Sequence, residues 1–178
     1  MSGRAWKRLF ALSLAVLALG APTSAAGTPP RTISSVNALE AGVLVELNAV
    51  RARHKLASLR LSSSLSAAAN VHSKAMAERG FFSHSSADGT SFWKRVQSHY
   101  GSAGYGYWSV GENLLWKSPA IDAGEAVKMW LDSAPHRKNL LAPQWREIGL
   151  AAVRAAAAPG AFEGLDVTIV TADFGART

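Results

Sequence analysis

The sequence predicts a single-domain α+β protein, and three observations carry this prediction. Apolar residues recur at three- and four-residue steps in three segments, which indicates helices near residues 36–50, 64–79 and 121–133. Two β-rich runs at residues 148–153 and 166–174 follow these helices and indicate two antiparallel strands. The chain has 178 residues and no cysteine, and a mature chain of roughly 150 residues buries enough surface to fold as one domain without disulfides.

Residues 1–26 have the anatomy of a secretory signal peptide. Three basic residues precede an apolar run at residues 9–19, and small residues then lead to a cleavage site after Ala25 or Ala26. The apolar run is too short to span a bilayer, and no other long apolar run follows. We therefore expect an exported protein, periplasmic or extracellular, whose mature chain has no membrane-spanning segment.

Residues 27–35 are rich in proline, serine and threonine, and they predict a disordered linker before a domain at residues 36–178. The formal net charge is +7, and the predicted signal peptide carries three of the basic groups and no acid, which leaves +4. These positive groups are scattered along the sequence, whereas a nucleic-acid-binding surface needs them clustered, so no nucleic-acid partner is expected. Weak attraction to an anionic envelope polymer stays open.

The stretch at residues 130–150 places a histidine between two prolines. Pro135 ends the helix before it, because it has no N–H and restricts the preceding residue. His136 follows at once, and Pro143 ends a short turn. Trp130 lies on the apolar face of the helix, so we expect His136 to have a fixed place beside a buried aromatic ring. Alone, His136 would be interpreted as a residue that caps a helix.

Three other polar residues lie beside apolar anchors. His84 follows two phenylalanines on irregular backbone, and it is either a loop histidine in water or a functional residue. Glu112 lies in an apolar segment that is expected to be a strand or a turn entering one, where a carboxylate is unfavourable unless it is paired. It could bond to a backbone turn or an arginine, or it could meet His84 or His136. His72 lies on a partly apolar helix face and is expected to be packed and hydrogen-bonded.

Two predictions concern packing in the helical segments. Asn48 and Arg51 lie on the flank of the first helix, where they form either a surface pair or a bridge to a neighbouring segment. Trp93, in a short helix at residues 91–99, and Trp130 both fall on apolar helix faces. We therefore expect both tryptophans to be core residues.

Several motifs occur in order between about residues 43 and 175. They are LNxxR from Leu47, HSxxMAxxGxFSH from His72, GEN from Gly111, WxxSxxHRxNLL from Trp130 and IGxx from Ile148. Five motifs in one order resemble the bacterial, here cysteine-free, branch of the CAP superfamily, named for cysteine-rich secretory proteins, antigen 5 and pathogenesis-related 1 proteins. Its domain is also called the SCP domain. The resemblance implies an α-β-α sandwich, with a small antiparallel sheet between helical layers and an open cleft.

The resemblance also implies a site in that cleft. In the family, two histidines and two acids can hold a divalent cation, often described as zinc. By position, the histidines correspond to His84 and His136 and the first acid to Glu112, with Asn113 beside it. The second acid corresponds to Ser133, which is a departure from the family pattern. The resemblance therefore implies a ligand cleft with three metal ligands, His84, Glu112 and His136, and water or Ser133 in the fourth place.

The expected function is ligand binding by an exported CAP domain, with an unknown small ligand, lipid or envelope component as its partner. Two histidines and one carboxylate with an open position also occur in hydrolytic zinc sites, so a metal-assisted hydrolase of peptide or cell-wall material is one alternative. No HExxH-like helix and no GxSxG elbow completes a catalytic constellation, so no enzyme activity is assigned. A lipid- or sterol-binding module, for which the aromatic loop at residues 105–108 is a candidate wall, or a secreted effector is the other alternative.

Overall fold

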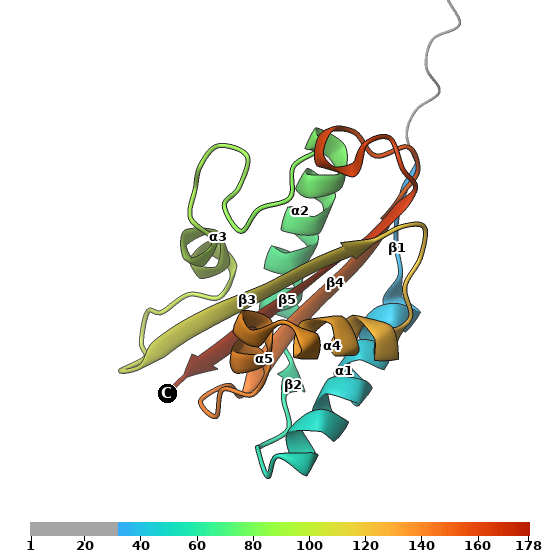
Figure 1. Ribbon diagram of the computed structural model, residues 1–178. Coiled ribbons are helices and arrows are strands. Elements are labelled where there is room, and N and C mark those ends of the chain that lie inside the picture. Colours follow the sequence, from blue (N-terminus) through green and yellow to red (C-terminus); the bar gives the residue numbers. More distant parts are fainter. Residues whose placement is uncertain (1–31) are drawn as a thin grey trace, which may run out of the picture.

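A five-stranded sheet lies between two layers of helices in the computed structural model, which describes residues 32–178 (Figure 1). The strand order is β1-β4-β5-β3, and β2 pairs with β4 beside this path. The elements in chain order are β1 (Ile33–Ser35), α1 (Asn37–Arg53), β2 (Arg60–Leu61), α2 (Ser63–Arg79), α3 (Phe92–His99), β3 (Trp108–Lys117), α4 (Ala123–Asp132), α5 (Ala134–Leu140), β4 (Glu147–Ala155), a 3-10 turn (Gly160–Phe162) and β5 (Val167–Arg177).

Helices cover both faces of the sheet, which confirms the α-β-α sandwich. Helices α1, α4 and α5 lie in front of it in Figure 1, and α2 and α3 lie behind. Side chains of β4 alternate between the layers as strand geometry requires: Ile148 and Leu150 join the core under α1 and α4, and Val153 joins the core under α2. Gly149 faces α2, and a Cβ there would lie 2.0 Å from the backbone of Leu65. The lack of a side chain therefore allows α2 to cross β4 closely.

The three long strands pair antiparallel, and β5 lies between the other two. Strand β3 pairs with β5 over ten residue positions, with Glu112 opposite Asp173. Strand β4 pairs with the other edge of β5. The two expected strands at residues 148–153 and 166–174 are thereby confirmed. One short pairing departs from this pattern, because the two-residue strand β2 runs parallel to β4.

The prediction of a disordered linker at residues 27–35 is wrong for residues 33–35. These residues form β1, whose backbone groups pair with the edge of β4 opposite Ala155 and Val153. Pairing with an existing strand edge fixes the backbone even where the local composition favours disorder. The predicted signal peptide and the start of the linker lie outside the described residues. No helix between residues 32 and 178 combines the length and apolarity that crossing a bilayer requires.

The segment after Pro135 is helical, which corrects the short turn expected there. Pro135 ends α4 as predicted, but it also occupies the first turn of α5, where its fixed φ and missing N–H are tolerated. Ser133 lies between the two helices with extended backbone. The two helices therefore change direction at Ser133, and His136 lies within α5 instead of in a loop.

Asn48 and Arg51 form a bridge to neighbouring segments, and they are not a surface pair. Asn48 exchanges two hydrogen bonds with the backbone of Leu59, at 2.8 and 3.1 Å. Arg51 is fully buried and donates through Nη1 to the carbonyls of Leu140, at 2.7 Å, and Ala142, at 3.1 Å. The end of α1 is thereby joined to β2 and to the end of α5.

The two tryptophans expected in the core provide a matched test of the fold. Trp130 is 1% exposed, which confirms the prediction, whereas Trp93 is 42% exposed, which makes that prediction wrong. Trp130→Ala should lower the free energy of unfolding by about 3–5 kcal/mol, because a large cavity opens between α4 and the sheet. Trp93→Ala should cost about 1 kcal/mol or less. Urea titration of both variants measures the difference, and equal losses would contradict this placement of α3 and α4.

Candidate functional site

A cleft of about 540 Å³ lies where the loop after α2, strand β3 and helix α5 meet. It contains four of the five predicted site residues, together with Phe92, Gly111, Pro135 and Asn139; the four are His84, Glu112, Asn113 and His136. Strand β3 is at the edge of the sheet, and successive residues face opposite layers. Glu112 faces the layer of α3, and Asn113 faces α5. The cleft therefore extends over the sheet edge, with one histidine contributed by each layer.

Glu112 is the buried centre of the site, with its side chain 1% exposed. Its Oε2 forms an ion pair with Arg95 of α3, whose side chain is 6% exposed. Its Oε1 accepts a hydrogen bond from His84 Nδ1 at 2.8 Å. Glu112 thus meets both an arginine and a histidine, but not His136. Because His84 uses Nδ1 as the donor, its Nε2 is left to act in the cleft.

The loop that carries His84 is held by two buried side chains. His72 of α2 donates from Nε2 to the Ser83 carbonyl at 2.8 Å, which confirms its predicted packed and hydrogen-bonded state. Burial, followed by the charge of Arg95, lowers the pKa of His72. Arg95 Nη1 donates to the carbonyl of His84 itself at 3.0 Å. The side chain of His84 is 54% exposed, so a rigidly placed backbone presents an accessible imidazole.

Asp173 of β5 lies under the site, opposite Glu112 across the β3–β5 pairing. It is fully buried, and neither of its carboxylate oxygens receives a hydrogen bond from a donor among residues 32–178. Burial, followed by the charge of Glu112, raises the pKa of Asp173 well above its ordinary value, against the opposing charge of Arg95. With a proton on Asp173, the buried group of Glu112, Asp173 and Arg95 has no net charge.

His136 is fixed by an amide pair from the other side of β3. Asn113 Nδ2 donates to the carbonyl of His136 at 3.1 Å, and Asn139 Nδ2 donates to Asn113 Oδ1 at 3.0 Å. A Cβ at Gly111 would lie 2.7 Å from Asn139 Oδ1, so this glycine provides the space for Asn139. Burial and the neighbouring His84 lower the pKa of His136, which is therefore neutral at pH 7. Asn113 supports the site and is almost completely buried.

Ser133, the fifth predicted site residue, lines a separate but adjoining pocket. This pocket has a volume of about 270 Å³, and its other lining residues are Phe82, Leu114, Leu115, Trp116, Met129, Trp130 and His136. His136 also lines the polar cleft. Ser133 therefore lies in an apolar compartment on the far side of His136, and not with His84 and Glu112.

The arrangement does not fit a divalent cation. Residues 32–178 contain no group of three histidine, aspartate or glutamate side chains that could hold a metal ion. Both oxygens of Glu112 are engaged, and Arg95 supplies the positive charge that a cation would bring. A cation at His84, Glu112 and His136 would require His84 to leave its hydrogen bond. Metal binding at these residues stays a prediction, and it would require this rearrangement of His84.

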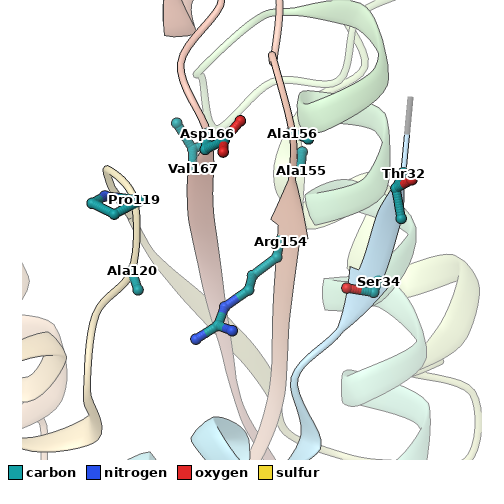
Figure 2. A pocket seen from close by; sticks show the side chains of 9 residues that line it. All are labelled: Thr32, Ser34, Pro119, Ala120, Arg154, Ala155, Ala156, Asp166 and Val167. Atoms are coloured by element: carbon teal, nitrogen blue, oxygen red, sulfur yellow. The ribbon is translucent and has the colours of Figure 1, made fainter. Parts of the chain in front are cut away.

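A further pocket lies at the opposite end of the sheet. It has a volume of about 320 Å³ between the start of β1, the end of β4 and the segment before α4. Figure 2 shows the guanidinium of Arg154 extending toward Pro119 and Ala120, with Ser34 on the opposite strand. It contains none of the predicted site residues.

Fold and site together define a class of protein: an α-β-α sandwich whose cleft is lined by two histidines above buried acids. The model of the cysteine-rich secretory protein family, CAP, matches residues 44–174. The chain therefore belongs to the CAP family, and the resemblance drawn from its sequence motifs is confirmed.

Two curated relatives come from Bacillus subtilis. The uncharacterized protein YkwD is 34% identical over 134 residues, which are 73% of this chain and 49% of YkwD. The uncharacterized membrane protein YlbC is 31% identical over 111 residues, which are 62% of this chain and 30% of YlbC. The matched region thus spans about half of the first relative and less of the second.

Two solved structures share the fold. An extracellular SCP-domain protein from Bacillus anthracis superposes with a TM-score of 0.61 at 27% identity, over 79% of this chain and 41% of that chain. An outer surface protein from Borrelia burgdorferi superposes with a TM-score of 0.63 at 19% identity, over 83% of this chain and 100% of that chain. The second likeness shows the fold alone.

Sequence reasoning missed Arg95, Asp173 and Asn139. Asp173 carried a detectable signal, because an acid within a β-rich run is unfavourable unless it is paired or protonated. Arg95 is adjacent to the buried Val96 on the inner face of α3. Its position gave no comparable signal, because arginine is ordinary on a short amphipathic helix.

The raised pKa of Asp173 predicts a pH-dependent stability. The folded state keeps this proton at pH values where the unfolded chain has released it, so stability falls as pH rises above the ordinary pKa of an aspartate. The slope is at most about 1.4 kcal/mol per pH unit. The Asp173→Asn variant cannot ionise at this position. Its free energy of unfolding should therefore increase relative to that of the wild type as the pH rises from acid to neutral. Denaturant titrations across that range measure the difference, and a constant difference would contradict a protonated Asp173.

Proposed function

We propose that this chain is an exported CAP-domain protein that binds an amphipathic small ligand in its cleft. The observation that carries the proposal is the meeting of a polar cleft and an apolar pocket at one residue, His136. A ligand with a hydrogen-bonding head and an apolar part would occupy both compartments. Concave sites that combine an apolar lining with a few convergent polar groups are the usual form of small-molecule sites.

The polar compartment offers directed hydrogen bonds without a strong charge. Glu112, Asp173 and Arg95 together have no net charge when Asp173 holds its proton. The lowered pKa of His136 keeps that imidazole neutral at pH 7. Neutral imidazoles both donate and accept hydrogen bonds. The head group that these residues suit is a carboxyl, hydroxyl or amide group.

The apolar compartment exposes side chains that are usually buried. Phe82 is 39% exposed and Met129 is 38% exposed, and both line the pocket beside Trp116. Methionine and aromatic side chains adapt to apolar ligands of irregular shape. This lining supports an acyl chain or an apolar side chain as the second part of the ligand.

Export is part of the same proposal. Its support is the charged, apolar and small-residue sequence of residues 1–26, together with the likeness to the extracellular SCP-domain protein from Bacillus anthracis. N-terminal sequencing of the exported form should find a start at Ala26 or Gly27. Recovery of intact Met1 on a stably membrane-embedded product would contradict it.

A metal-assisted hydrolase receives less support from the geometry. That mechanism needs an open metal position and a separate general base. Here Glu112 is neutralised by Arg95 and bonded to His84. We therefore assign no reaction to the cleft.

Dodecanoate, with a carboxyl head and an acyl chain, tests ligand binding. It should bind the wild type and shift the ring proton resonances of His84 and His136 in NMR spectra. His136→Ala should weaken binding about tenfold, which is the loss of one hydrogen bond to a charged group. His99→Ala is the matched control, since His99 is exposed at the end of α3 and lies outside both compartments. Equal weakening by the two variants, or no shift of either imidazole, would contradict the proposed site.

A zinc titration tests the metal separately. Calorimetry at neutral pH should show little saturable uptake by the wild type, because Arg95 compensates the charge of Glu112. Arg95→Gln should strengthen uptake, since it leaves that carboxylate free, and His84→Ala combined with Arg95→Gln should abolish the gain. Tight zinc binding by the wild type would show that His84 leaves Glu112 and that the three predicted ligands converge.

A further inference from the structure

The fold gathers basic residues that are scattered in the sequence at one end of the domain. This basic end is formed by the end of α1, strand β2 and the turn between α5 and β4, which lie together at the bottom of Figure 1. Its exposed cations are Arg53, Lys55, Arg60 and Arg146. The backbone N–H of Arg60 donates to the carbonyl of Arg146 at 3.0 Å, which joins two of them directly.

A buried cation adds to the charge of this end. Arg51 is fully buried, its Nη2 has no hydrogen-bond partner in the described part of the chain, and its other nitrogens bond to carbonyls only. Burial, followed by the charge of Arg146, lowers the pKa of Arg51. Two arginines are therefore close enough to repel each other where no carboxylate intervenes.

Acidic residues do not neutralise the basic end. None of its five cations takes part in an ion pair among residues 32–178. Glu147 follows Arg146 in sequence, but its carboxylate accepts a hydrogen bond from Tyr100 at 2.5 Å and lies near Arg177. Glu46, exposed on α1, is about two turns away from Arg53 along the helix. The positive charge of this end is therefore available to an outside partner.

An exposed apolar side chain lies at the same end of the domain. Leu61 of β2 is 60% exposed, and its pairing with Ile148 places its side chain on the α1 side of the sheet, the opposite side from Arg60. A soluble polyanion uses only the cations, whereas a membrane surface accepts both the cations at its headgroups and an apolar side chain at the acyl boundary. The combination favours a lipid surface over a dissolved polymer.

We propose that the basic end docks this domain on a membrane surface through anionic lipid headgroups, with Leu61 entering the interface. Each cation held near such a surface strengthens binding about fivefold. The docking surface is separate from the cleft of His84, Glu112 and His136, and it does not depend on what the cleft binds.

Vesicle co-sedimentation of the purified full chain tests the proposal. The probes are phosphatidylcholine vesicles with and without phosphatidylglycerol, so that any contribution of the apolar segment at residues 9–19 is common to both. The wild type should prefer the anionic vesicles, and added salt should reduce the preference. Arg53→Gln with Arg60→Gln should weaken it about 25-fold, which is two cations at about fivefold each. Both side chains are exposed, and neither forms an ion pair within residues 32–178.

Arg154→Gln is the matched control for loss of a cation. Arg154 is exposed at the far end of β4, beside the pocket of Figure 2 and roughly 25 Å along the strand direction from Arg146. This distance exceeds the screening length at physiological salt, so the variant should bind like the wild type. Equal weakening by Arg154→Gln would mean that net charge, and not this surface, drives binding, and would overturn the proposal.

Leu61→Ser distinguishes a membrane from a dissolved polyanion. It should weaken binding to the anionic vesicles several-fold and leave binding to soluble polyphosphate unchanged. Circular dichroism melts of every variant should match the wild type, because the changed side chains are exposed. No preference of the wild type for phosphatidylglycerol, or a Leu61→Ser variant that binds vesicles like the wild type, would overturn membrane docking.

Discussion

The ion pair between Glu112 and Arg95 determines how the rest of the site is arranged. A carboxylate that is nearly excluded from water needs a partner, and the guanidinium supplies one from the neighbouring helix layer. The same guanidinium bonds to the backbone of His84, so charge neutralisation and loop placement depend on one side chain. Arg95 pairs with only one of the two buried carboxyl groups, and burial together with the charge of Glu112 raises the pKa of the other, Asp173.

The cleft results from the position of β3 at the edge of the sheet. Alternation along this strand directs Glu112 to one layer and Asn113 to the other, so side chains from both layers meet at the strand. Hydrogen bonds to backbone carbonyls then fix both histidine-bearing segments. Apart from His136, the residues that line the adjoining apolar pocket take no part in these hydrogen bonds. The family relationship therefore identifies the hydrogen-bonded frame better than it identifies the ligand.

Much of the fold could be predicted because hydrophobic periodicity reports which face of an element is buried. The failures occur where one residue's environment depends on distant chain segments. Trp93 and Trp130 have similar local patterns, yet only Trp130 is covered, by α1 and the sheet. The motifs identified the residues of the cleft, but they could not show that Ser133 faces another compartment or that Asp173 lies opposite Glu112, since both facts follow from strand register and helix direction.

Trp130 forms a hydrogen bond to the backbone of β3, which is a strand at the edge of the sheet. Strand β3 has β5 on one side only, and among residues 32–178 no strand pairs with its other edge. Unpaired strand edges invite the addition of a strand from another chain. The indole of Trp130 donates to the carbonyl of Leu114 at 3.1 Å and is buried against this strand. One side chain thus fills the core and also satisfies a backbone acceptor of this edge strand.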